Sequence, residues 1–108
     1  MPIDPQDERQ WPRNIGQTRT VEGIDGKPMT YTIEDEILYP QSELPEKLIC
    51  FQRLRFEDGN RELRLAYYML GARNYWVWGQ YATMIPSKDF AAIIAKAQSA
   101  GWFKTGES

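Results

Sequence analysis

Two alternating runs on either side of an Asp-Gly pair constrain the fold of this chain more than any other feature. Leu48–Phe56 and Arg61–Leu70 are rich in residues that favour strands, and the segment between them contains Asp58-Gly59. Asp-Gly favours a tight turn because glycine adopts a positive φ without steric cost. We therefore predict an antiparallel hairpin with a two-residue turn at Asp58-Gly59.

The register of this hairpin determines which side chains meet. With a two-residue turn, Phe56 faces Arg61 and Arg53 faces Arg64. Apolar and polar residues alternate along the second strand, so that its apolar side chains share one face. That face carries Leu63, Leu65, Tyr67 and Met69. We expect it to be the core face, with Cys50 buried on the same side as an unreactive thiol.

Further strands are expected on both sides of this hairpin. Thr18–Ile24 and Met29–Ile33 flank Asp25-Gly26, which predicts a second hairpin, and the segment 40–45 is expected to be a connector bounded by prolines. A third strand of the meander is expected from Tyr75 to Met84 or Ile85. With a four-residue turn at 71–74, its tryptophans, Trp76 and Trp78, join the core face. A turn with an odd number of residues would reverse the faces.

A single helix is predicted at the C-terminal end of the domain. Ser87 is a suitable N-cap, and Asp89 lies in the first turn, where the helix dipole favours an anion. The apolar residues Phe90, Ile93, Ile94 and Ala97 recur at helical spacing. Gly101 is a stop signal, and we expect Trp102 and Phe103 to fold back against the helix end.

These elements predict an α+β fold with two layers. We expect a three- to five-stranded antiparallel sheet, made of a hairpin and a three-stranded meander, with one C-terminal helix packed on one face. Residues 1–16 contain three prolines among charged residues and are predicted to be a mobile N-terminal arm, whose end Trp11 and Ile15 could hold against the body. Residues 17–103 then form the single domain, and residues 104–108 a frayed tail.

Composition limits the chemistry that the chain can perform. Its 108 residues include no histidine and one cysteine. A histidine-based catalytic triad and a zinc site of Cys and His ligands are therefore excluded within one chain. We expect no catalytic residues, no metal and no cofactor. The single cysteine fits a reducing compartment, and the polar N-terminal segment contains no apolar signal, so we expect a cytoplasmic protein without membrane association.

Charge is distributed unevenly along the sequence. Residues 1–46 carry ten acidic and four basic residues, whereas residues 47–81 carry three acidic and six basic residues. The predicted meander is therefore basic, although the whole chain has a formal net charge of −2. The acidic run Glu34-Asp35-Glu36 is interpreted as solvated charge or as a partner for arginines rather than as a metal site, because neighbouring side chains alternate in direction along a strand.

The candidate binding site is a row of arginines on the open face of the sheet. In the predicted register Arg53, Arg64 and Tyr81 form one cross-strand row, with Arg55 and Tyr68 beside it. Like charges that face each other on a sheet are destabilising, so this row requires an anion. The anion is either an outside ligand, because arginine suits phosphate and carboxylate, or the acidic run at 34–36.

Two functions remain open at this point. The favoured hypothesis is a small non-catalytic interaction module that binds a protein partner or a second copy of itself, because the meander is aromatic and its third strand is expected at a sheet edge. The alternative is binding of nucleic acid or of a phosphate ligand on the arginine and tyrosine face. The order of strands and helix is similar to that of sheet-based DNA-reading domains, but the sequence pI of 5.1 argues against nucleic acid.

Overall fold

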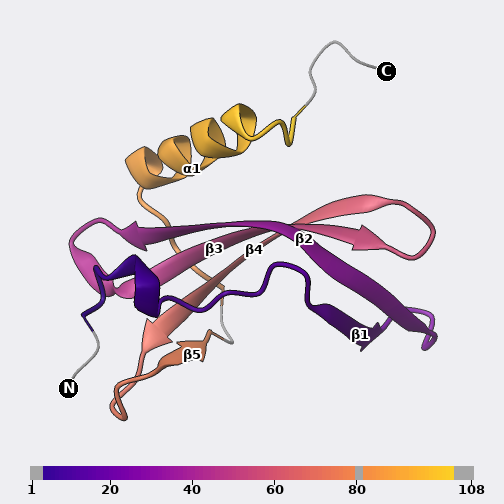
Figure 1. The fold of residues 1–108 in the computed structure, drawn as a ribbon, viewed down its shortest axis with the longest axis horizontal. Coiled ribbons are helices and arrows are strands. Elements are labelled where there is room, and N and C mark those ends of the chain that lie inside the picture. The colour runs from indigo at the N-terminus through magenta and orange to yellow at the C-terminus, as the bar shows by residue number, and fades with distance from the viewer. Residues whose placement is uncertain (1–3, 80–81, 104–108) are drawn as a thin grey trace.

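Five antiparallel strands follow one another in chain order across one curled sheet (Figure 1). The computed structural model describes residues 4–79 and 82–103, so the expected tail at 104–108 lies outside the described residues. The described elements are the 3₁₀ helix η1 (Glu8–Gln10), the strands β1 (Thr18–Glu22), β2 (Pro28–Gln41), β3 (Leu44–Phe56), β4 (Arg61–Leu70) and β5 (Trp76–Trp78), and the helix α1 (Ser87–Ser99). The predicted fold class, an antiparallel sheet with one C-terminal helix, is confirmed.

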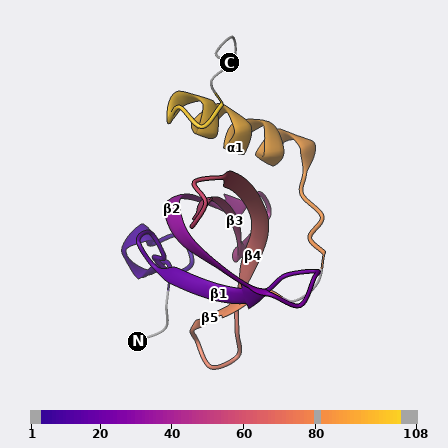
Figure 2. The ribbon, with the colours of Figure 1, turned by 90° about the vertical axis from the view of Figure 1, so that its right-hand side faces the viewer.

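The sheet curls into a half-barrel with α1 on its outer side (Figure 2). We call the side that carries α1 the outer face and the concave side the inner face. On the outer face, Ile49 and Phe51 of β3 pack against Ile93 and Ala97 of α1 and against Trp102. On the inner face lie two further buried clusters, one around Tyr31, Ile33 and Leu54 and the other around Leu48, Cys50 and Tyr68. The core is therefore divided between the two faces of one sheet.

The helix begins and ends close to the predicted residues. Gly101 has a φ of +81°, the Trp102 amide donates to Ala97 and the Gly101 amide donates to Gln98, which is the Schellman arrangement. Trp102 is buried against the helix end, as expected. No helix in the described part of the chain has both the length and the apolar character needed to cross a bilayer.

The start of α1 is attached to the sheet by a buried carboxylate rather than by a side-chain N-cap. Pro86 occupies the N-cap position, and no side chain caps the helix there. Asp89 is almost completely buried and accepts hydrogen bonds from the backbone amide, at 2.7 Å, and the hydroxyl of Ser42. Ser42 lies in the turn between β2 and β3, so this contact fixes the helix over that end of the sheet.

The predicted register of the β3–β4 hairpin is wrong by one residue. Arg53 faces Leu63, not Arg64, and Arg64 faces Gln52. The loop has three residues, with Gly59 at a φ of +89° and the Phe56 amide donating to Asn60. Asp-Gly occupies the last two positions of this longer turn, where only the glycine needs a positive φ. The extra loop residue shifts every pair in the hairpin.

The β4–β5 hairpin also departs from the prediction, because its loop has three residues rather than the predicted four. Asn74, at a φ of +64°, takes the position that Gly59 takes in the first loop. Trp76 and Trp78 consequently lie opposite Leu70 and Tyr68 on the inner face, away from the helix. β5 is the sheet edge, as expected, but it spans three residues, and Ala82 to Ile85 are not in a strand.

β2 is longer than predicted and contains a bulge. The connector expected at 40–45 is instead a tight turn, because Gln41 pairs with Leu44 and Glu43 adopts a φ of +64°. Between Ile33 and Asp35 the pairing shifts by one residue, so Glu34 and Asp35 together oppose Arg53. This bulge brings Glu36 opposite Gln52 on the inner face.

The N-terminal segment lies against the inner side of the sheet. Trp11 packs against the cluster around Leu48, and its indole NH donates to the Pro5 carbonyl at 2.9 Å. Ile15, the other expected anchor, is exposed. That residues 1–16 form a mobile arm and residues 17–103 the single domain stays a prediction.

Candidate functional site

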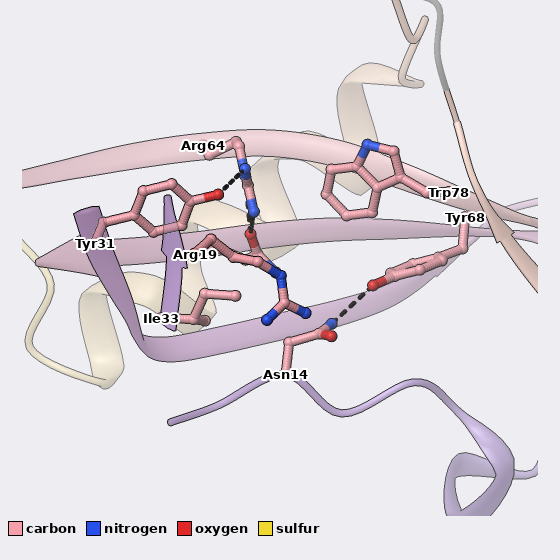
Figure 3. Close-up of a pocket in the computed structure, with 8 residues that line it drawn as sticks. Asn14, Arg19, Tyr31, Ile33, Arg64, Tyr68 and Trp78 are labelled. Atoms are coloured by element: carbon pink, nitrogen blue, oxygen red, sulfur yellow. Dashed lines mark hydrogen bonds between the residues drawn. The ribbon is translucent and has the colours of Figure 1, made fainter. Parts of the chain in front are cut away.

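The inner face of the half-barrel contains a hollow of about 340 Å³ (Figure 3). It opens between the two sheet edges, since β1 contributes Arg19 and β5 contributes Trp78. Its floor is formed by the central strands. The lining residues are Asn14, Arg19, Tyr31, Ile33, Gln52, Arg64, Tyr68 and Trp78.

Arg64 is the central polar group of this hollow. Its Nε and Nη2 donate to Gln52 Oε1 at 3.0 and 2.6 Å, and its Nη1 donates to the Tyr31 hydroxyl at 2.7 Å. The guanidinium carbon also lies 5.2 Å from the centre of the Tyr31 ring and 5.1 Å from that of Trp78, both within cation–π range. The side chain is thus held by two aromatic groups and one amide, and it is pointed into the hollow (Figure 3).

A chain of hydrogen bonds behind Arg64 fixes its orientation. Gln52, which is 1% exposed, donates from Nε2 to Glu36 Oε1 at 2.8 Å. Glu36 also accepts from the backbone and side-chain amides of Asn14, at 3.1 and 2.9 Å. The Asn14 amide in turn donates to the Tyr68 hydroxyl at 2.7 Å. The bulge in β2 makes this network possible, because without it Glu36 would point to the outer face.

In the part of the chain that the structure describes, the charge of Arg64 is not paired with a carboxylate. Its three hydrogen-bonded contacts are to the neutral groups of Gln52 and Tyr31, and no ion pair links it to an acid among residues 4–79 and 82–103. An arginine has five N–H donors, so two of them have no hydrogen-bond partner among those residues. Arg19 adds a second guanidinium, which donates to the side chain of Gln17 and to the Thr18 carbonyl.

The structure separates the residues that the sequence placed in one row. Arg64 and Tyr68 lie on the inner face and line the hollow. Arg53 and Arg55 lie on the outer face, so the predicted pairing of Arg53 with Arg64 is wrong. Tyr81 lies outside the described residues. Whether any of these residues binds a ligand stays a prediction.

The arginines of the outer face lie close to Glu34 of the acidic run 34–36. The acidic run was one of the two sources of an anion that the sequence left open. Glu34 lies 2.8 Å from Arg61 Nε, 3.0 Å from Arg53 Nε and 3.9 Å from Arg55 Nη1. Among the described residues, only Arg61 makes hydrogen bonds to Glu34, and Arg53 Nε has no hydrogen-bond partner there despite its close approach. The hydrogen bond from Arg61 holds the pKa of Glu34 below its ordinary value.

Several lining residues were not among the predicted site residues. Tyr31, Gln52 and Trp78 come from three different strands, and Asn14 comes from the N-terminal segment. The sequence contains a signal for Gln52, because it is a polar residue in a strand whose neighbours are buried. Nothing local indicates Asn14, since its role depends on a contact across 54 residues with Tyr68.

Two titratable groups near the hollow, the Tyr68 hydroxyl and the Cys50 thiol, are buried. Burial raises the pKa of the Tyr68 hydroxyl and that of the Cys50 thiol, so both groups are neutral at pH 7. Within the described ranges, no three Asp, Glu or Cys side chains come together as metal ligands. The hollow therefore offers cationic donors, amides, hydroxyls and aromatic faces.

Comparison of the chain with protein-family models, with curated proteins and with solved structures gave no match.

Proposed function

We propose that this domain is a non-catalytic binding module that holds a small organic anion in the inner hollow. The ligand carries a carboxylate or a phosphate group attached to a planar ring. The observation that supports this proposal above all is the Arg64 guanidinium, which is directed into the hollow with neutral partners only. A fixed cation with unused donors is the group that proteins use to recognise planar or tetrahedral oxyanions.

The surroundings of Arg64 favour an anion over a neutral ligand. Arg19 places a second positive charge at the mouth of the hollow, and the one carboxylate of the network, Glu36, is already engaged by Asn14 and Gln52. Because Gln52 separates Glu36 from Arg64, it orients the arginine without neutralising it. An anionic group that contacts both arginines would be attracted by two positive charges.

The aromatic residues account for the ring of the proposed ligand. Trp78 is 38% exposed, whereas Tyr31 is buried, so the indole is the surface that a ligand ring can cover. Tyr68 packs edge-on against Trp78, with ring centres 5.1 Å apart, and supports it from the inner cluster. A hollow of about 340 Å³ is near the lower end of the range for small-molecule sites, which favours a compact ligand.

Calorimetric titration tests the proposal directly. The purified protein is titrated at low salt with inorganic phosphate, a nucleoside monophosphate, benzoate and the uncharged nucleoside. We expect the ring-bearing anions to bind and the nucleoside to fail, and the comparison of monophosphate with benzoate identifies the preferred anion. Arg64→Gln should weaken binding by at least tenfold, because a charge-assisted hydrogen-bond pair is lost.

Two further variants separate loss of the site from loss of the fold. Arg64→Lys retains the charge but not the planar fork, and should give intermediate affinity. Arg73→Ala removes an exposed arginine from the β4–β5 turn and should bind as the wild type does. If no anion in the panel binds at low salt, or if Arg64→Gln binds as well as the wild type, the proposed function is wrong.

Two observations support the non-catalytic part of the proposal and a cytoplasmic location. The Cys50 thiol is completely buried and its pKa is raised by burial, which argues against a nucleophile. A single cysteine that forms no disulfide fits a reducing compartment.

Binding of a protein partner is the second candidate function, and the exposed leucines of β4 on the outer face favour it.

A further inference from the structure

We infer that the outer face of the β3–β4 hairpin is a docking surface for a protein segment in which acidic and apolar residues alternate. This surface lies on the opposite side of the sheet from the hollow and does not depend on the proposed ligand. We call it the hairpin surface. It consists of Arg53, Arg55, Arg61, Leu63 and Leu65.

The pairing of β3 with β4 places these five side chains side by side. Arg55 faces Arg61, Arg53 faces Leu63, and Phe51 faces Leu65 in three successive pairs on the outer face. In Figure 1 the tip of the hairpin extends past the end of α1. The helix packs over β2 and β3, and Leu63 and Leu65 of β4 remain exposed on this face.

The leucines of the hairpin surface are exposed to a degree that their neighbours on β3 are not. Leu63 is 44% exposed and Leu65 is 39% exposed, whereas Phe51 beside them is 7% exposed. Neighbouring exposed apolar side chains on a sheet offer the apolar side chains of a partner a surface against which they can be buried. Their spacing along one strand suits an extended segment with every second residue apolar.

The arginines indicate the charge of the partner. Three guanidinium groups share the carboxylate of Glu34, and the side chains of Arg55 and Arg61 are 52% and 58% exposed. Two further acids lie near this face. The Asp35 carboxylate accepts hydrogen bonds from the Trp102 indole and from the Glu36 amide, and Glu57 lines a hollow with Arg55 but forms no ion pair with an arginine of the described residues. Glu34 is the acid that forms ion pairs with these arginines among the described residues, and one carboxylate shared by three guanidinium groups leaves the facing pair of Arg55 and Arg61 only partly compensated.

Acidic side chains on a partner would complete this compensation while its apolar side chains cover the two leucines. Nucleic acid is the other polyanion that arginines attract, but it offers nothing apolar on its backbone to cover Leu63 and Leu65. The observations together favour a peptide segment.

Fluorescence anisotropy tests this inference with three labelled probes. The first is a short peptide of alternating leucine and glutamate, the second has lysine in place of glutamate, and the third is a thymidine oligonucleotide. We expect only the leucine–glutamate peptide to bind, with an affinity that falls as salt rises. Arg55→Ala should weaken binding about two- to fivefold, which is the range of a partly exposed ion pair, and Arg55→Glu should weaken it further.

A leucine variant and two control variants show whether the peptide binds to the hairpin surface. Leu63→Ser should lower the affinity for the leucine–glutamate peptide about fourfold, because the exposed part of the leucine side chain would be buried in the complex. Arg73→Ala and Arg64→Gln should leave peptide binding unchanged, the latter even if it abolishes binding in the hollow. Circular dichroism melts confirm that each variant is folded at the temperature of the titration.

The inference is overturned if the leucine–glutamate peptide fails to bind, or if Arg55→Glu and Leu63→Ser both bind it as the wild type does. Binding of the oligonucleotide with the same dependence on Arg55, without binding of the peptide, would assign the surface to nucleic acid instead. Equal binding of the glutamate and lysine peptides would show that charge has no part in the contact.

Discussion

Replacing Gln52 by methionine tests whether the network behind Arg64 has the role that its geometry implies. Methionine matches glutamine in length and nearly in volume, so the variant creates no cavity and no overlap. It removes one amide that makes three hydrogen bonds. Two of these are accepted from Arg64, at 3.0 and 2.6 Å, and one is donated to Glu36 at 2.8 Å.

The expected loss of stability follows from the charge and burial of these groups. Each hydrogen bond to a charged group is worth about 1.5–3 kcal/mol net when buried. The two bonds from Arg64 share one acceptor atom, and Arg64 is partly exposed, so water replaces part of that loss. Glu36 keeps its two bonds from Asn14. With about 1 kcal/mol regained from the apolar side chain, the free energy of unfolding should fall by about 2–3 kcal/mol.

A loss of that size is easily measured. For a domain of this length it corresponds to a fall in Tm of roughly 10–20 °C, which thermal melts and urea titrations followed by circular dichroism both detect. Gln98→Met is the matched control, because Gln98 is exposed on α1, and its Tm should stay within about 2 °C of wild type. If Gln52→Met also melts within about 2 °C of wild type, the network does not stabilise the inner face and the reasoning is refuted.

Three other changes have expected outcomes. Gly79→Ala should lower the free energy of unfolding by about 1–3 kcal/mol in urea titrations, because the added Cβ would overlap the ring of Tyr67; an unchanged midpoint would contradict this packing. The hydrogen bond from Arg61 holds the pKa of Glu34 below its ordinary value of 4.5, so the contribution of Glu34 to stability is complete above about pH 4.5 and is lost as the pH falls through the lowered pKa. In thermal melts at a series of acid pH values, the Tm of Glu34→Gln should therefore fall less with pH than that of the wild type. Parallel curves of Tm against pH would contradict this expectation. Cys50 should react with a thiol reagent only as fast as the protein opens, and rapid labelling of the native protein, followed by absorbance, would contradict its burial.

The prediction succeeded where the signal was local. Alternation along 48–56 and 61–70 predicted two paired strands, and the helical spacing of Ile93 and Ala97 predicted the buried side of α1. Gly101 predicts the end of the helix, because glycine takes the left-handed conformation that a Schellman motif requires. These features depend on residues a few positions apart, and the sequence displays them directly.

The candidate site was predicted only in part because single residues in the turns decide it. The loop that ends at Gly59 has three residues instead of the predicted two, which moved Arg64 away from Arg53, and the loop that ends at Asn74 has three instead of the predicted four, which moved the tryptophans to the inner face. Turns of two and three residues both accept Asp-Gly, so the sequence does not distinguish them. Because side chains alternate along a strand, such a shift exchanges the two faces completely.

The sequence by itself determined the class of fold, the absence of histidine chemistry and the concentration of arginines in the meander. Only the tertiary structure decided which arginines are neutralised. The bulge at Glu34 directs that carboxylate to the arginines of the outer face. It also directs Glu36 to Gln52, which lies between Glu36 and Arg64 in the hydrogen-bond network. The physical reason is that charge compensation depends on distances between strands, and these distances are set by the curl, the register and one inserted residue of the sheet rather than by the order of residues along the chain.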